Sequence, residues 1–123
     1  MTIKPYVVEL GYGADLHGAD ATKAARRAVK DAISRSCLCG LFEIVGLRDP
    51  DAMQVAVKIG CPRPEQVDGA AVLAELPFGA KTLEVVEGGL TTRGVEVPSL
   101  GCGDGIIVAV ASLTVSVEVE DNG

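Results

Sequence analysis

The segment of residues 11–18, GYGADLHG, carries the side chains best suited to acid–base chemistry. It contains Asp15, His17 (the one histidine of the chain) and three glycines, Gly11, Gly13 and Gly18. Residues two apart in an extended segment point to the same side, so the Asp15 carboxylate could orient the His17 imidazole for proton transfer. The sequence therefore predicts a small-molecule enzyme, a hydrolase or an acid–base catalyst, with His17 as the base and Asp15 as its orienter.

Other interpretations of the same loop stay open. Free backbone N–H groups at the start of a helix bind anions, and glycines let a ligand approach the backbone closely. Gly11, Gly13 and Gly18 then line the binding site of a non-catalytic, oligomeric protein that holds or senses a small anion. In a purely structural interpretation, Asp15 and His17 cap the helix and pin the turn. A dinucleotide fingerprint is excluded, because Leu16 occupies the place of its third glycine.

Four more charged residues lie at predicted strand ends or in loops, where binding residues gather: Lys58, Arg63, Glu87 and Asp104. With His17 they are expected to bind a small anionic or amide-rich ligand, and the alternative is that each is an exposed charge. A third interpretation is a metal-binding protein that uses Asp15, His17 and either Glu87 or Asp104, because carboxylates and imidazole are acceptable metal ligands. The first two interpretations require neither a metal nor a cofactor.

A strand and a helix must position this loop. Apolar residues spaced at i, i+3 and i+4 from Ala21 to Ile33 predict a helix over residues 20–36, and five of the seven residues in its stripe are alanine. Asp20 is the expected N-cap. Residues 3–10 predict a strand that ends at Gly11. An alanine stripe lets the helix lie close to the sheet that it covers.

The remaining elements complete a two-layer α+β domain. Residues 42–45 and 53–59 predict an antiparallel hairpin, residues 68–76 a short helix capped by Asp68, and residues 81–87 a strand. Residues 88–104 are expected to form a long irregular loop with a brief strand at 95–97. Residues 105–119 predict a central strand whose first half is buried on both faces. The order matches a ferredoxin-like βαββαβ arrangement with an extra strand, with helices on one face of a mainly antiparallel sheet and residues 1–123 as a single domain.

The other face of that sheet has no cover in the predicted fold. The sequence therefore predicts a homo-oligomer, a dimer or a trimer-type ring, in which residues 88–105 of the same or a neighbouring subunit complete the site. Eleven basic against 17 acidic residues, a net charge of −6, argue against partners such as nucleic acid or an anionic membrane. At 3% aromatic residues, a small-molecule ligand is expected to be held by hydrogen bonds and charge rather than by stacking.

The expected location is cytoplasmic. The first residues lack a basic leader followed by an apolar run, and the longest apolar stretch, residues 106–111, is far shorter than the about 20 residues of a membrane span. Cys37 and Cys39 lack the two-residue spacing of a zinc knuckle or a thioredoxin-type dithiol. With Cys61 and Cys102 they are therefore expected to be free thiols.

Residues 23–33, 57–65 and 85–90, read together with the GxGxDxHG pattern of residues 11–18, resemble a family of conserved hypothetical proteins from bacteria and plants. The resemblance covers nearly the whole chain. It implies that Gly11, Gly13, Asp15, His17 and Gly18 occupy the positions of the family signature, and it supplies no reaction. Residues 27–33 are also similar to a helix of the ring-opening amidohydrolases that act on cyanuric acid and barbiturate. Those enzymes use Ser–Lys pairs, for which no serine here is obviously placed.

Overall fold

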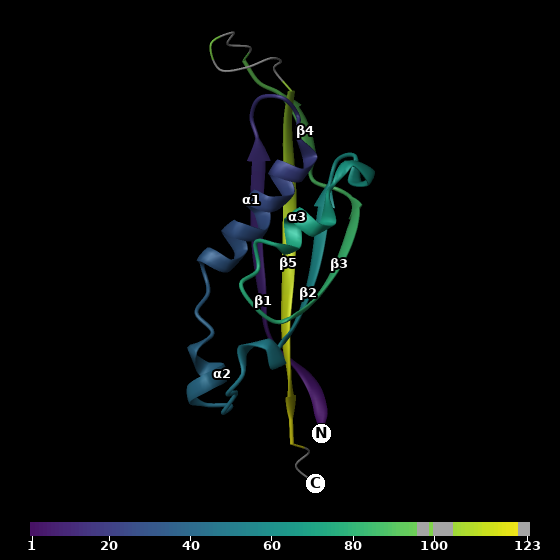
Figure 1. The fold of residues 1–123 in the computed structure, drawn as a ribbon. Helices are drawn as coiled ribbons and strands as arrows, with labels where there is room; N and C mark the ends of the chain where they lie inside the picture. Colours follow the sequence, from purple (N-terminus) through teal and green to yellow (C-terminus); the bar gives the residue numbers. More distant parts are fainter. Residues whose placement is uncertain (96–98, 100–104, 121–123) are drawn as a thin grey trace.

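One five-stranded sheet with helices on one face forms the protein in a computed structural model, which describes residues 1–95, 99 and 105–120 (Figure 1). The long strands β1 (Thr2–Asp15) and β5 (Gly105–Val119) pair antiparallel, and β2 (Gln54–Cys61) pairs antiparallel with the other side of β5. β3 (Ala80–Glu87) runs parallel to β2, and β4 (Leu90–Arg93) pairs antiparallel with the beginning of β5. The α+β class, with a mainly antiparallel sheet and helices on one face, is therefore confirmed.

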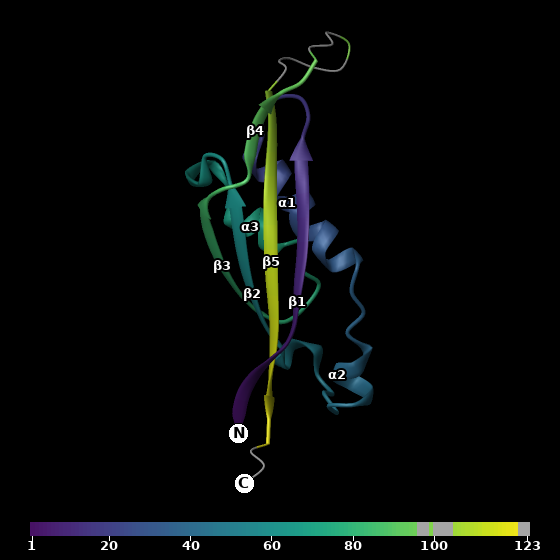
Figure 2. The same cartoon turned by 180° about the vertical axis from the view of Figure 1, so that it is seen from behind.

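β5 is the central strand of the sheet, as its sequence predicts. Its odd-numbered residues from Ile107 to Val117 are buried beneath the helices, on what we call the helix face. Its even-numbered residues point to the opposite side, the open face, where Figure 2 shows no helix over the strands. The expected burial of the first half on both sides is wrong, since Val110 is 46% exposed on the open face. The described residues supply no element to cover it.

The alanine helix forms as predicted and lies against β1 and β5 (Figure 1). α1 (Ala21–Ser34) begins after its N-cap Asp20, whose Oδ1 accepts a hydrogen bond from the backbone N–H of Lys23 at 3.1 Å. Its stripe is buried as expected: Ala21, Ala24, Ala25, Ala28, Val29 and Ala32. Small side chains on this stripe bring the helix backbone close to the sheet.

The predicted hairpin of residues 42–45 and 53–59 is wrong in its first strand. Residues 42 and 43 belong to the helix α2 (Cys39–Glu43), and the backbone N–H groups of Ile44 and Val45 both bond to Gly40 O, at 2.9 and 3.0 Å. Local turn bonds thus replace the pairing that a strand would need. This segment buries Gly40 and Leu41, whereas Ile44 is 85% exposed.

Smaller differences concern the ends of elements. β1 runs past Gly11 to Asp15 because its pairing with β5 continues to the contact of Asp15 with Ile107. The second predicted helix is the shorter α3 (Gly69–Leu73), with Asp68 as its N-cap. Single 3₁₀ turns form at Pro50–Ala52 and Pro64–Gln66. In the predicted loop 88–104, a strand forms at Leu90–Arg93; residues 96–98 and 100–104 lie outside the described residues.

None of the helices in the described ranges has the length and apolar character needed to cross a membrane.

Candidate functional site

Asp15 is a buried anchor at the end of β1. Its side chain Oδ2 accepts a hydrogen bond from the backbone N–H of Asp20 at 2.8 Å, and its Oδ1 lies 3.9 Å from Nη1 of Arg27. The residue is 4% exposed. These contacts close the loop between β1 and α1, since Asp20 is the N-cap of the helix that follows. Asp15 therefore has the turn-pinning role of the structural interpretation.

His17 lies in the same loop, and its Nδ1 atom forms no hydrogen bond with Asp15. Among the described residues, the buried Nδ1 atom of His17 has no hydrogen-bond partner. Gly18 follows with φ +102°, a conformation that favours glycine, and a Cβ atom there would lie 3.7 Å from Oδ2 of Asp15. The loop thus keeps a buried carboxylate and a buried, unpaired imidazole nitrogen two residues apart. The orientation of His17 by Asp15 stays a prediction.

Gly11 and Gly13 lie beneath α1. A Cβ atom on Gly11 would lie 2.5 Å from Ala28 O, and one on Gly13 would lie 2.6 Å from Ala24 O. Both distances are far below van der Waals contact, so only glycine permits the helix to lie this close to β1. This packing explains why these glycines stand in the loop motif; their contact with a ligand stays a prediction.

The other predicted ligand residues are spread over the sheet. Lys58 lies on the open face, where its Nζ is 3.5 Å from Oε1 of Glu84, so the sheet separates it from Asp15. Arg63 is exposed after β2 and has a left-handed backbone, with φ 54°. Glu87, at the end of β3, lies opposite Cys61 in the strand pairing. Asp104 lies outside the described residues.

Cys61, the residue opposite Glu87 in the strand pairing, contacts the beginning of α1. The Cys61 thiol donates a weak hydrogen bond to Ala21 O at 3.8 Å. Burial raises the pKa of that thiol, and the negative charge of Glu87 raises it further. In the part of the chain that the structure describes, however, no three His, Cys, Asp or Glu side chains are grouped to hold a metal ion. Asp15, His17 and Glu87 therefore do not form the predicted metal site.

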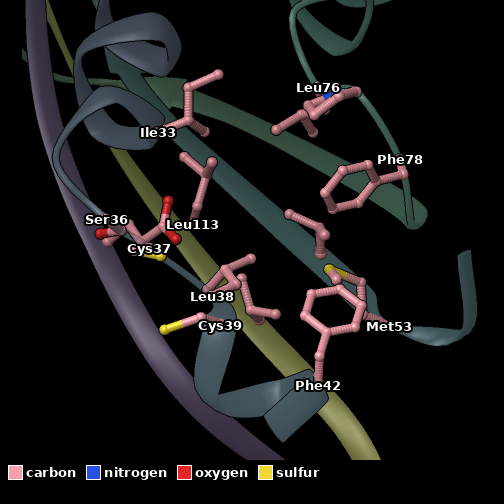
Figure 3. Close-up of a pocket in the computed structure, with 14 residues that line it drawn as sticks. Ile33, Ser36, Cys37, Leu38, Cys39, Phe42, Met53, Leu76, Phe78 and Leu113 are labelled. Atoms are coloured by element: carbon pink, nitrogen blue, oxygen red, sulfur yellow. The ribbon is translucent and has the colours of Figure 1, made fainter. Parts of the chain in front are cut away.

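A hollow of about 460 Å³ opens on the helix face, where the helices end before the sheet does (Figure 3). We call it the Glu9 hollow. Figure 3 shows Ile33 at the end of α1 facing Leu76 and Phe78 across it, with Phe42 and Met53 at one end. The floor is formed by β2 and β5 and by side chains of Val55, Leu113 and Val115. Its walls are almost entirely apolar.

Glu9 is the carboxylate of this hollow. It follows Val7 on the helix face of β1 and lines the hollow, and it is 5% exposed. Burial raises the pKa of the Glu9 carboxyl, and desolvation is its only resolved cause. No hydrogen bond or cation in the described structure stabilises the charged form. The Glu9 oxygens are not among the fully buried, unpartnered atoms of the described residues, so they open onto the hollow. A carboxylate that faces apolar walls without a protein partner is unusual, so the position calls for an explanation beyond folding.

Two exposed thiols line the same hollow. Cys37 and Cys39 are free: Cys37 lies between α1 and α2, and Cys39 is the first residue of α2, with Leu38 between them (Figure 3). A hydrogen bond with Cys37 raises the pKa of the Cys39 thiol, and repulsion from the charge of Cys37 adds to this effect. The described cysteines 37, 39 and 61 are unpaired, as predicted, and Cys102 lies outside the described residues.

The conserved hypothetical protein family Lin0512_fam matches residues 5–115. The chain belongs to this family. It is also similar to a crystal structure of an FtsZ-like protein of unknown function from Nostoc punctiforme, with 43% identity and a TM-score of 0.87 over 96% of this chain and 98% of that chain. Among curated proteins, none matches. Membership of a conserved hypothetical family is thus confirmed, while the likeness to ring-opening amidohydrolases gains no support from these comparisons.

The sequence of this Lin0512_fam member carries one signal that points to Glu9. Along β1 the residues facing the helices alternate with those facing away, so Val7, Glu9, Gly11 and Gly13 share one side. An acidic residue in phase with Val7 on a half-buried strand is unusual and marks a special position. The sequence alone shows that Glu9 alternates with the residues that face the helices. Whether α1 covers Glu9 or leaves it facing a hollow depends on the length of α1 relative to β1.

Proposed function

We propose that this protein binds a small, largely apolar molecule that carries a cationic amine, with the amine held by Glu9 in the hollow. The observation that carries this proposal is the Glu9 carboxylate, which opens onto an apolar hollow and has no protein partner among the described residues. Charged groups in protein interiors are normally paired, and removing the partner of a buried charge is strongly destabilising. A ligand cation would supply that partner.

The size and lining of the hollow define the ligand class further. Small-molecule sites have volumes of roughly 300–1,000 Å³ and place a few polar groups in mainly apolar walls. The Glu9 hollow, at about 460 Å³, falls in this range, and its walls include two aromatic rings, Phe42 and Phe78. Aromatic walls stabilise a cation as well as an apolar body. An arylalkyl or alkyl amine fits this chemistry, whereas an anion would be repelled by Glu9.

Binding of benzylamine tests the proposal. Benzyl alcohol and benzoate serve as comparison ligands, because they share its aromatic ring but carry a neutral and an anionic group instead of the amine. We expect benzylamine to raise the melting temperature, benzyl alcohol to act weakly, and benzoate to have no effect. Glu9→Gln should abolish the preference for the amine. Glu84→Gln is the matched control, since Glu84 is an exposed carboxylate on the open face. Equal binding of benzylamine to wild type and Glu9→Gln would refute the role of Glu9.

A second candidate function is acid–base catalysis at the loop of residues 11–18. The buried, unpartnered Nδ1 of His17 close in sequence to the buried Asp15 favours it. In this candidate, His17 is the base for hydrolysis of a small amide or anionic substrate, and Asp15 holds the loop. A panel of small cyclic amides tests it: His17→Asn should lose turnover and keep binding. Unchanged turnover in His17→Asn would exclude His17 as the base.

A further inference from the structure

Cys37 and Cys39 are placed to react with each other. Both thiols are exposed, both line the Glu9 hollow, and a single residue separates them in the chain. Leu38, between them, has φ −95° and ψ 20°, a folded rather than an extended backbone. That conformation draws the Cα atoms of its two neighbours together, toward the roughly 4.4–6.8 Å that a disulfide spans.

Leu38 connects the two thiols to the interior of the hollow. It is half-buried, packs against the hydrophobic core and lines the hollow together with Cys37 and Cys39 (Figure 3). A bond between the cysteines on either side of it would close a small ring around its backbone. Because the ring restricts the φ and ψ angles of Leu38, its formation acts directly on a side chain in the wall of the hollow.

We propose that Cys37 and Cys39 form a reversible dithiol–disulfide pair that changes the shape of the Glu9 hollow. This inference rests on the ligand site proposed above and adds regulation to it. Exposed or strained disulfides have high reduction potentials and are the readily reversible ones. A ring closed over a single intervening residue belongs to this group.

The oxidant that the reaction requires is a small disulfide such as glutathione disulfide. Both thiols are exposed, and we assign the first attack to the Cys37 thiolate and the resolving step to Cys39. Its sulfur bonds to one sulfur of the oxidant, the oxidant's S–S bond breaks, and one glutathione leaves and takes up a proton. Cys39 then loses its proton and attacks the Cys37 sulfur, and the second glutathione leaves. Two cysteine thiols are oxidised to one disulfide, and glutathione disulfide is reduced to two thiols.

Mass spectrometry of the intact chain tests the covalent step. In a Cys102→Ser background, treatment with glutathione disulfide should remove two hydrogen atoms from the chain, and peptide mapping should locate the bond between residues 37 and 39. Cys61 is buried and serves as an internal control that stays reduced. Cys39→Ser should instead retain one glutathione on Cys37, because the resolving thiol is missing. Stable glutathione adducts on the chain that keeps both cysteines would overturn the proposal.

Methyl NMR spectroscopy tests the change in the hollow. Oxidation should shift the methyl signals of Leu38 and of Leu76 across the hollow, and leave those of Val110 on the open face in place. A disulfide that forms without moving the Leu76 signals would show that the pair does not act on the hollow. Neither measurement uses benzylamine, so a failure of amine binding would count against the proposed function alone.

Discussion

The backbone N–H of Tyr12 donates a hydrogen bond to Oδ2 of Asp31 at 2.9 Å, which joins the outer edge of β1 to the side of α1. One turn earlier in the helix, Nη1 of Arg27 donates to Ala14 O at 2.7 Å. β1 is an edge strand, and unpaired backbone groups on such an edge invite pairing with other chains. The charged side chains of α1 therefore satisfy part of this edge from within the chain.

Removal of the Asp31 carboxylate should expose that edge. We expect Asp31→Ala to lower the free energy of unfolding by about 1–2 kcal/mol, since a charge-assisted bond to a backbone donor is lost. Urea unfolding measures the change. Asp31 also forms an i,i+4 ion pair with Arg35 at 3.0 Å. Arg35→Ala is thus the control, and its expected cost is below about 0.5 kcal/mol. Equal losses in the two variants would show that the bond to Tyr12 adds nothing.

The close contact of α1 with β1 should make Gly11 and Gly13 intolerant of any side chain. We expect Gly11→Ala and Gly13→Ala each to destabilise the fold by about 3 kcal/mol or more, because the added Cβ overlaps helix backbone rather than a flexible side chain. Gly105→Ala is the matched control: its Cβ would meet Ala19 Cβ at an ordinary 3.7 Å, and φ is not in the left-handed region. Its expected effect is within about 0.5 kcal/mol. Thermal unfolding followed by circular dichroism compares the three, and tolerance of alanine at position 11 or 13 would contradict the packing argument.

Local patterns predict the parts of this fold that depend on neighbours in sequence. The spacing of alanines places α1, and Asp20 caps it, because both effects act within a few residues. In contrast, the continuation of β1 through Gly11 depends on pairing with β5, which is distant in the sequence, and the glycine at that position depends on the close approach of α1. The glycines Gly11 and Gly13, which predict close approach of a ligand, are therefore equally well explained by the close approach of α1.

Two further features were not predicted from the sequence. Phe42 and Val45 have side chains typical of a strand, but local bonds to Gly40 fold the segment into a helical turn. The Glu9 hollow depends on the lengths of α1 and α3 relative to β2 and β5. The types and spacing of Asp15 and His17 single out their loop as a candidate site, but the partners of Asp15 follow from how the loop closes.

Glu9 should give this protein a distinctive dependence of stability on pH. Burial raises the pKa of the Glu9 carboxyl in the folded state above its ordinary value, which the unfolded chain retains. Between these two values, the folded state holds a proton that the unfolded state has released. The contribution of Glu9 to stability is therefore present at low pH and is lost as the pH rises through the folded-state pKa.

Glu9→Gln should remove this loss. We expect the variant to gain stability relative to wild type as the pH rises through that window, and the difference to level off above it. Urea unfolding at a series of pH values measures both proteins, with Glu84→Gln as an exposed control. A difference between wild type and Glu9→Gln that is independent of pH would contradict the raised pKa of Glu9. A bound amine should reverse the trend, because it stabilises the charged carboxylate.

The open face of the sheet should mediate self-association. Val8, Leu10 and Tyr12 of β1 are 54%, 65% and 62% exposed there, and Tyr12 lies opposite the exposed Val110 of β5. Contiguous exposed apolar side chains of this kind mark interaction surfaces, and two open sheets can pack face to face about 10 Å apart. Light scattering after size exclusion should therefore give a mass above 12.6 kDa.

Leu10→Lys should lower the measured mass to the mass of one chain, while the unfolding free energy changes by less than about 0.5 kcal/mol. Ile44→Lys, at an 85% exposed apolar residue next to α2, should leave the mass unchanged. A wild-type mass of one chain at micromolar concentration would rule out this use of the open face.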